Sequence, residues 1–349
     1  MLAELFEGKT VPLVGLDISG SAVKMVEVAS AGKGTYRVER YAIEFLPPKS
    51  VVDGNIANVE AVADVVRRCH KKLGTRIKNV AMALPTAAVI TKKIICPAGL
   101  RDDELEAQVE GEANQYIPFS LDEVNLDFQV VGPSGTDGTE VEVMLAASRK
   151  EKVEDRIAVA ESAGLRTMVM DVESLAMQLA FELIRTKVTT GKIEANIVYA
   201  DIGSVDTKIT VFRDQEVVYQ REQAFGGTHL NLEIQRHFGI SAEEAETAKR
   251  TGSLPASYEA EVLRPFLDNA ALEVQRALQL FYTSTQYNSV DHIVVAGGCA
   301  ALPGLSEAIT TKTGVPATVA NPFAAMQIAQ RVQLKKGSSG SRVGDFGSF

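Results

Sequence analysis

The sequence predicts an α/β protein with a duplicated core, two lobes facing each other across a cleft, and a small inserted α+β subdomain. Two stretches carry this prediction, GLDISGSAVKMVEV (15–28) and DIGSVDTKITV (201–211). In each, an apolar strand carries an aspartate near its end, a turn of small residues follows, and a second strand returns. A third turn, with two glycines, follows the apolar run HIVVA (292–296). Self-similarity on this scale favours a duplicated fold over a solenoid.

The composition is typical of a globular protein and excludes several classes. The chain has 349 residues, enough for two or more domains, and a net charge of −9, which does not attract nucleic acid. Its apolar runs are far shorter than the roughly 20 residues of a membrane-spanning helix, and the N-terminus lacks a signal-peptide core. The three cysteines are far apart and make no metal-ligand spacing with the four histidines. We therefore expect a cytoplasmic protein without a structural metal.

The first lobe is expected to take its core from residues 1–85 and 166–195. Its opening strands are predicted from three alternating segments, 13–18, 22–29 and 35–46. A helix is expected over 58–74, because valines recur at helical spacing and Gly74 stands where a C-cap belongs. The strand NVAMAL (79–84) follows.

Residues 86–165 are expected to form the inserted α+β subdomain. It would contain strands and helices at 91–96, 101–116, 124–132, 140–148 and 149–163. The second lobe is expected to take its core from 196–227 and 287–330, with a helical subdomain at 228–286. The Gly/Ser-rich end, 335–349, is expected to be a flexible tail.

The two aspartate hairpins indicate phosphate chemistry. Small turn residues let several N–H groups point at one phosphate, and a neighbouring carboxylate can hold Mg²⁺ directly or through water. Asp17 and Asp201 are therefore the candidate metal ligands, mostly through water. The candidate phosphate-binding residues around them are Ser19, Gly20, Ser21, Lys24, Gly203 and Ser204. A turn-capping role for Asp17 is the competing interpretation, and the repetition of the pattern weakens it.

The same residues resemble motifs of the actin, sugar-kinase and heat-shock-chaperone superfamily, which has a duplicated ribonuclease-H-like fold. DISGSAVK (17–24) resembles its first phosphate motif, DIGSVDTKITV (201–211) its second, and VVAGGCAALPGL (294–305) its adenosine motif. Residues 170–183 stand where the superfamily has its interdomain connecting helix. The resemblance implies an actin-like ATPase fold with ATP and Mg²⁺ as cofactors.

The resemblance also implies roles for further residues. Nucleotide contacts are implied for Thr207, Gly227, Gly297 and Gly298, and contacts to the ribose and base for Glu246 and Lys249. For Thr207 an ordinary strand-edge role stays open. Glu173 is the candidate catalytic residue: it either orients an attacking water or is an acid favoured at a helix N-terminus.

Within the superfamily, the insertion resembles that of FtsA and, more closely, that of the PilM family of type IV pilus proteins. NQYIPFSLDEVNLDFQVVG (114–132) and VMLAASRKEKVEDRIAVAESAGL (143–165) carry this resemblance. It implies an ATP-binding cytoplasmic scaffold with at most slow ATPase activity, acting in pilus assembly and twitching motility. The implied partner is the N-terminal cytoplasmic peptide of PilN, bound in a groove beside the insertion. PilO and PilP would be reached indirectly, the motor ATPases are candidate partners, and the inner membrane would be reached only through partners.

Two alternatives on the same fold stay open. One is a sugar or acetate kinase, although the sequence offers no convincing catalytic base between Asp17 and Glu173. The other is an FtsA-like filament protein attached to the membrane by an amphipathic C-terminal helix, although residues 335–349 lack a leucine or aromatic face.

Overall fold

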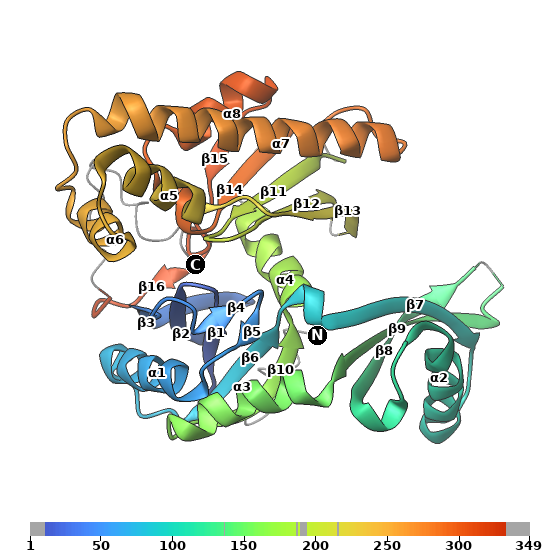
Figure 1. Cartoon of the computed structure of the whole chain (residues 1–349). Helices are drawn as coiled ribbons and strands as arrows, with labels where there is room; N and C mark the ends of the chain where they lie inside the picture. The colour runs from blue at the N-terminus through green and yellow to red at the C-terminus, as the bar shows by residue number, and fades with distance from the viewer. Residues whose placement is uncertain (1–10, 136, 186–187, 189–193, 215, 333–349) are drawn as a thin grey trace. The chain divides into compact units, whose positions relative to one another are not determined.

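The structure is a computed structural model that describes residues 11–135, 137–185, 188, 194–214 and 216–332 (Figure 1). The tail expected at 335–349 lies outside the described residues. The chain divides into two compact units. Unit 1 comprises residues 1–28 and 39–177, and unit 2 comprises residues 29–38 and 178–349.

Unit 1 is built on a mixed sheet with the strand order β10-β6-β1-β2-β3-β16. Its long strands are β1 (Val14–Ile18), β2 (Ala22–Gly32), β3 (Thr35–Phe45), β6 (Asn79–Leu84) and β10 (Arg166–Val172). Strand β6 runs parallel to both β1 and β10, whereas β1 and β2 are antiparallel. The short strand β16 (Gln327–Ile328) pairs with the part of β3 that belongs to unit 2. The three opening strands predicted from sequence are confirmed, whereas β10 was not foreseen.

Helix α1 (Val59–Leu73) covers this sheet and has the ends that its sequence predicts. The Asn58 side chain accepts a hydrogen bond from the backbone N–H of Ala61 at 2.9 Å, which caps the N-terminus. Gly74 ends the helix at φ 70°, a conformation that glycine adopts without strain. Val62, Val65 and Val66 are buried in the core of unit 1. A short hairpin, β4 (Val51–Val52) and β5 (Asn55–Ile56), precedes the helix.

The insertion has its own sheet and its own core (Figure 1). Strands β7 (Val89–Pro97), β9 (Glu140–Arg149) and β8 (Val124–Ser134) form an antiparallel sheet in that order. Helix α2 (Asp102–Tyr116) packs its buried residues into the same core as these strands, while its acidic side chains are mostly exposed. Short 3₁₀ turns, Thr86–Ala88 and Leu121–Glu123, precede β7 and β8.

The predicted boundary of the insertion at residue 165 needs a correction. Helix α3 (Lys150–Ser162) was expected to belong to the insertion. Its buried residues Val159 and Ala160 instead lie in the core formed with β1, β2 and α1. The insertion's own core therefore ends with β9, because periodicity shows which face of a helix is buried and not what covers it.

Unit 2 is built on a second mixed sheet with the order β13-β12-β11-β14-β15. Its strands are β11 (Asn196–Ile202), β12 (Thr207–Arg213), β13 (Glu216–Gln223), β14 (His292–Ala296) and β15 (Ala317–Val319). Its helices are α5 (Gly227–Phe238), α6 (Ala242–Thr251), α7 (Arg264–Ser284) and α8 (Leu305–Thr313), with a π-helical turn at Glu259–Leu263 and a 3₁₀ turn at Gly298–Ala301. The strands and helices share one apolar core, which includes buried residues of the predicted helical segment 228–286.

Helix α4 (Glu173–Arg185) runs from unit 1 into unit 2. The ring of Phe181 stacks on that of Phe212 with centroids 4.0 Å apart and meets Tyr199 edge-on. The second half of this helix therefore packs in unit 2, whereas all of 166–195 was expected in the first lobe. Among the described residues, none of the helices has the length and apolar content needed to cross a membrane.

Candidate functional site

The first aspartate hairpin places Asp17 and Lys24 side by side. Asp17 on β1 pairs with Lys24 on β2, and the Lys24 ammonium lies 3.0 Å from Asp17 Oδ2. The Asp17 side chain is 57% exposed, so this ion pair is accessible to an anionic ligand. Ser19 closes the turn, because its backbone N–H and its hydroxyl both donate to the carbonyl of Ala22.

The remaining turn residues, Gly20 and Ser21, are exposed. Ser19 does not have a positive φ, so a serine fits this position of the turn without strain. The turn therefore presents small residues at the surface beside a carboxylate and an ammonium group. This arrangement has the chemistry expected of a phosphate-binding hairpin.

Glu173 lies at the first residue of α4, directly after β10. Its Oε2 accepts a long hydrogen bond, 3.4 Å, from the backbone N–H of Thr86. The nearby Arg156 was not predicted from the sequence. Only 2% of Arg156 is exposed, and burial lowers the pKa of its guanidinium while the charges of Asp17 and Glu173 raise it. The sequence signal was an arginine at helical spacing from the buried Val159 and Ala160.

The turn of the second aspartate hairpin contacts the first residues of α5. The backbone N–H of Gly203 donates to the carbonyl of Asp206 at 2.9 Å and closes the turn. The backbone N–H of Gly227 donates to the Gly203 carbonyl at 3.0 Å, and Thr228 donates to the Ser204 carbonyl through both its N–H and its hydroxyl. Thr228, which was not predicted from the sequence, joins this turn to the first turn of the helix.

Glycine is required where these two turns meet. A Cβ at Gly226 would lie 2.7 Å from the Gly203 carbonyl oxygen and 2.8 Å from that of Ser204. Side chains other than hydrogen would therefore push the two turns apart. The glycine pair at 226–227 thus brings the start of α5 onto the aspartate hairpin.

The third turn packs on the same hairpin. Gly297 has φ 85°, and a Cβ there would come within 2.4 Å of Asp201 Oδ1 and of the Ile202 carbonyl oxygen. Cys299, in the following 3₁₀ turn, places its Sγ 3.4 Å from the Gly203 carbonyl. The three turns of unit 2 that contain the predicted residues Asp201, Gly203, Ser204, Gly227, Gly297 and Gly298 therefore lie together.

The electrostatics at Cys299 reflect this packing. Burial raises the pKa of its thiol to about 11, Lys249 acts in the opposite direction, and the charge of Asp201 raises it further. The cysteine is thus a neutral packing residue between the turns at ordinary pH. Because the charge of Lys249 lowers the pKa of Cys299, helix α6, which carries Lys249, lies near the three turns.

Glu246 and Lys249 form one polar cluster with a residue of α5. The Lys249 ammonium lies 2.8 Å from Glu246 Oε2 and donates to Asn231 Oδ1 at 2.8 Å. The Asn231 amide in turn donates to Glu246 Oε2 at 2.8 Å. Asn231 was not identified from sequence, because its contribution depends on how α5 and α6 pack together.

Thr207 is 1% exposed, and its hydroxyl donates to the Phe225 carbonyl at 2.7 Å. This bond ties the start of β12 to the segment that leads into the glycine pair. The observed hydroxyl contact positions the turns of unit 2.

The described residues contain no group of three or more His, Cys, Asp or Glu side chains that could hold a metal ion. A Mg²⁺ ion at Asp17 or Asp201 would therefore depend on water and on ligand phosphates for most of its coordination, and a bound cation would neutralise phosphate charge there. The exposed carboxylate of Asp17 fits such a role.

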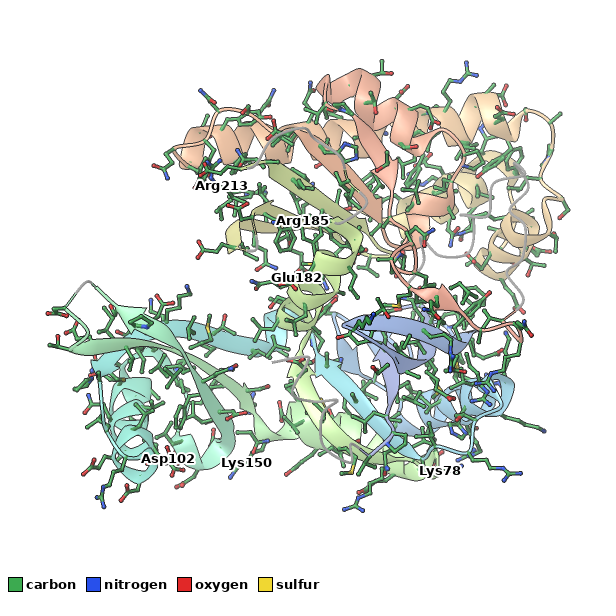
Figure 2. The ribbon with its side chains drawn as sticks, turned by 180° about the vertical axis from the view of Figure 1, so that it is seen from behind. Lys78, Asp102, Lys150, Glu182, Arg185 and Arg213 are labelled. Atoms are coloured by element: carbon green, nitrogen blue, oxygen red, sulfur yellow. The ribbon has the colours of Figure 1, made fainter. Side chains whose placement is uncertain are left out.

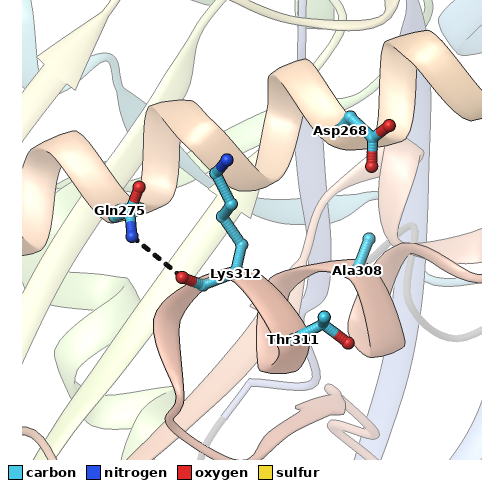
Figure 3. A pocket seen from close by; sticks show the side chains of 5 residues that line it. All are labelled: Asp268, Gln275, Ala308, Thr311 and Lys312. Atoms are coloured by element: carbon cyan, nitrogen blue, oxygen red, sulfur yellow. Dashed lines mark hydrogen bonds between the residues drawn. The ribbon is translucent and has the colours of Figure 1, made fainter.

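Two polar hollows of unit 2 contain none of the predicted residues. The first has a volume of about 410 Å³ and is lined by Asp268, Gln275, Ala308, Thr311 and Lys312 (Figure 3). The second has a volume of about 610 Å³, and its lining residues include Arg185 and Arg213. Both arginines are labelled in Figure 2, which shows the molecule from the side opposite to Figure 1. In the second hollow, the Arg213 guanidinium lies over the Tyr287 ring and pairs with Glu194.

Comparison with solved structures confirms the actin-like fold. A chain from a PilM–PilN type IV pilus biogenesis complex is 28% identical to this one, with a TM-score of 0.75, over 97% of this chain and 96% of its own. The ethanolamine utilization protein EutJ of Carboxydothermus hydrogenoformans is 20% identical, with a TM-score of 0.52, over 91% of this chain and 88% of its own. The likeness to EutJ shows the fold alone.

Curated relatives include cell division proteins FtsA. That of Streptococcus pneumoniae serotype 2 (strain D39 / NCTC 7466) is 25% identical over 263 residues, 67% of this chain and 54% of its own. That of Enterococcus hirae is 25% identical over 261 residues, 69% of this chain and 58% of its own. The chain thus spans a little over half the length of these relatives. The family model for the type IV pilus assembly protein PilM matches residues 15–339, and the chain therefore belongs to the PilM family of actin-like type IV pilus assembly proteins.

Proposed function

We propose that this chain is an ATP-binding scaffold of the type IV pilus inner-membrane assembly complex and binds the N-terminal cytoplasmic peptide of PilN. The observation that carries the proposal is the match over nearly the whole of both chains to a component of a solved PilM–PilN complex. Through PilN the scaffold would reach PilO, PilP and the inner membrane from the cytoplasmic side. The motor ATPases are further candidate partners, and twitching motility is the cellular output.

ATP is the proposed cofactor, with Mg²⁺. In unit 2, the hairpin after Asp201 would contact phosphates, the turn at Gly297–Gly298 would accommodate the adenosine, and Glu246 with Lys249 would contact the ribose and base. In unit 1, the turn 19–21 and Lys24 would contact phosphate groups. The packing of the glycine turns at 226–227 and 297–298 against the hairpin that carries Asp201 and Gly203 supports this assignment, because close backbone approach is what such ligands require.

The charge arrangement supports a negatively charged ligand. The Lys24–Asp17 pair is partly exposed, so Lys24 can exchange its carboxylate partner for a phosphate when Asp17 turns to a hydrated cation. Turnover is proposed to be slow, because Glu173 contacts the backbone N–H of Thr86 and is the only candidate base that the sequence suggested.

The insertion is the proposed site for the PilN peptide. Strand β7 is an edge strand of the three-stranded sheet, and an extended peptide can add to such an edge through main-chain hydrogen bonds. Ile94 and Cys96 point into the core under α2, so Ile95 projects from the opposite face and is 58% exposed. Burial of one such aliphatic side chain would contribute roughly 1.5 to 3 kcal/mol to peptide binding.

A pair of matched substitutions tests this placement. Ile95→Asp on edge strand β7 and Val131→Asp on edge strand β8 introduce the same charge at side chains that are 58% and 55% exposed. Calorimetric titration with the PilN N-terminal peptide should show binding that is at least tenfold weaker for Ile95→Asp and unchanged for Val131→Asp. Equal affinities for both variants and the unsubstituted chain would place the peptide elsewhere.

A further inference from the structure

Arg156 is a buried cation at the carboxyl ends of the parallel strands of unit 1. Its side chain projects from α3 and is 2% exposed. Its Nε donates to the carbonyl of Ala83 at 3.2 Å, and its Nη2 donates to the carbonyl of Gly54 at 3.0 Å. These carbonyls are dipoles and do not neutralise a guanidinium, so a buried charge of this kind requires anionic groups nearby.

The strand register shows which carboxylates meet that need. Ala83 on β6 pairs with Asp171 on β10, and Glu173 follows two residues later. On the other side, Gly15 of β1 pairs with Ala81 of β6 in parallel, and continuing that register by two residues brings Asp17 level with Ala83. Arg156 therefore binds a carbonyl of β6, which lies between β1, the strand that carries Asp17, and β10, the strand that leads directly into Glu173.

The effects of the neighbouring carboxylates on the pKa of Arg156 agree with this geometry. Burial lowers the pKa of the Arg156 guanidinium, whereas Asp17, Glu173 and Asp155 oppose that effect. The same attraction acts in the other direction, so the positive guanidinium makes the electrostatic potential at both carboxylates less negative. A divalent cation approaching them without phosphates is then attracted less strongly, whereas an anionic metal–nucleotide complex is attracted more strongly.

We propose that Arg156 is a positioning residue that supplies the internal counter-charge for Asp17 and Glu173 and so makes cation binding there depend on the nucleotide. Its two carbonyl contacts fix the β4–β5 turn and the end of β6 around the charge. This inference rests on the proposed nucleotide site. It assigns to Arg156 no contact with the nucleotide itself.

The test compares two ligands with opposite charge in three variants. Arg156→Gln removes the charge and keeps an amide donor, Arg156→Lys keeps the charge, and Arg166→Met is a control at an exposed arginine on β10. Calorimetry would measure binding of Mn²⁺ alone and of Mg·ATP. In Arg156→Gln we expect Mn²⁺ alone to bind about threefold or more tightly and Mg·ATP to bind about threefold or more weakly. The other two variants should resemble the unsubstituted chain.

Changes of opposite sign for the two ligands separate a charge effect from damage to the fold. The role of Arg156 is structural, and the proposal is wrong, if Arg156→Gln weakens the binding of both ligands or changes the binding of neither. The same conclusion follows if Arg156→Lys binds the two ligands as Arg156→Gln does, or if both variants lose stability equally. If the unsubstituted chain binds no Mg·ATP, the proposed nucleotide function fails, while the Mn²⁺ titration still tests Arg156 independently.

Discussion

The carboxylate of Asp201 lies against the backbone of Gly297, so closely that a Cβ at Gly297 would come within 2.4 Å of Asp201 Oδ1. This contact joins the second aspartate hairpin to the glycine turn after β14, two segments that pair in parallel within one sheet. The hairpin and the turn are therefore packed closely together, and the proposed nucleotide site depends on this packing.

The contact at Gly297 predicts that alanine substitutions at Gly297 and Gly298 have different effects on stability. Gly297→Ala should destabilise the fold by about 2 kcal/mol, because the residue has a positive φ and its Cβ would meet backbone atoms. Gly298→Ala should change stability by about 0.5 kcal/mol or less, since a Cβ there has no atom within 4 Å. Urea unfolding of both variants measures the difference, and equal stabilities would show that the turn relaxes freely.

Cys299 predicts a pH-dependent reactivity. Burial raises the pKa of its thiol to about 11, so the reactive thiolate is scarce in the folded chain at pH 8. Alkylation of Cys299, followed by mass spectrometry, should be slow at pH 8 and should speed up as the pH approaches 11 or when the chain is unfolded. Rapid labelling at pH 8 without unfolding would contradict the packed position between the three turns.

The same raised pKa has a consequence for stability. A group whose pKa is higher in the folded chain stabilises it fully below the pKa of the unfolded thiol, about 9, and this contribution is lost as the pH rises toward 11. The free energy of unfolding should therefore fall between pH 9 and 11 and fall less in Cys299→Ala. An identical pH dependence in Cys299→Ala and the unsubstituted chain would contradict this linkage.

The hydrogen bond of Glu173 predicts that the ATPase rate depends little on its carboxylate. Because its Oε2 accepts from the Thr86 backbone N–H, Glu173→Gln should leave a slow ATPase rate, well under about 10 s⁻¹, within about threefold of the original. Phosphate release from Mg·ATP measures the rate. A rate near that of a median enzyme, lost in Glu173→Gln, would instead make Glu173 a catalytic base.

Local features of the fold were predictable because they depend on neighbouring residues. The hairpins at Asp17 and Asp201 and the helix ended by Gly74 follow from turn chemistry and periodicity within short segments. Strand β10 was missed, because its partner β6 lies about 90 residues earlier (Arg166 pairs with Asn79) and parallel pairing leaves no local signal.

Two residues of the candidate site were not predicted from the sequence for the same reason. Arg156 and Asn231 acquire their roles only when α3 meets the end of β6 and α5 meets α6. The sequence shows that Arg156 shares a helix face with buried residues, but it cannot show which carbonyls and carboxylates that face meets. The boundary of the insertion failed similarly, because α3 follows β9 in the chain yet packs on α1.

The most direct test of the account is a calorimetric titration of Mg·ATP into the full chain and two variants with the same change of charge. Asp201→Asn alters the carboxylate against Gly297, whereas Asp268→Asn alters an exposed carboxylate of α7 in the hollow of Figure 3. We predict that Mg·ATP binds to the unsubstituted chain and to Asp268→Asn with equal affinity, and at least tenfold more weakly, by about 1.4 kcal/mol, to Asp201→Asn. Unaltered affinity in Asp201→Asn, or no binding to the unsubstituted chain, would contradict the proposed nucleotide site.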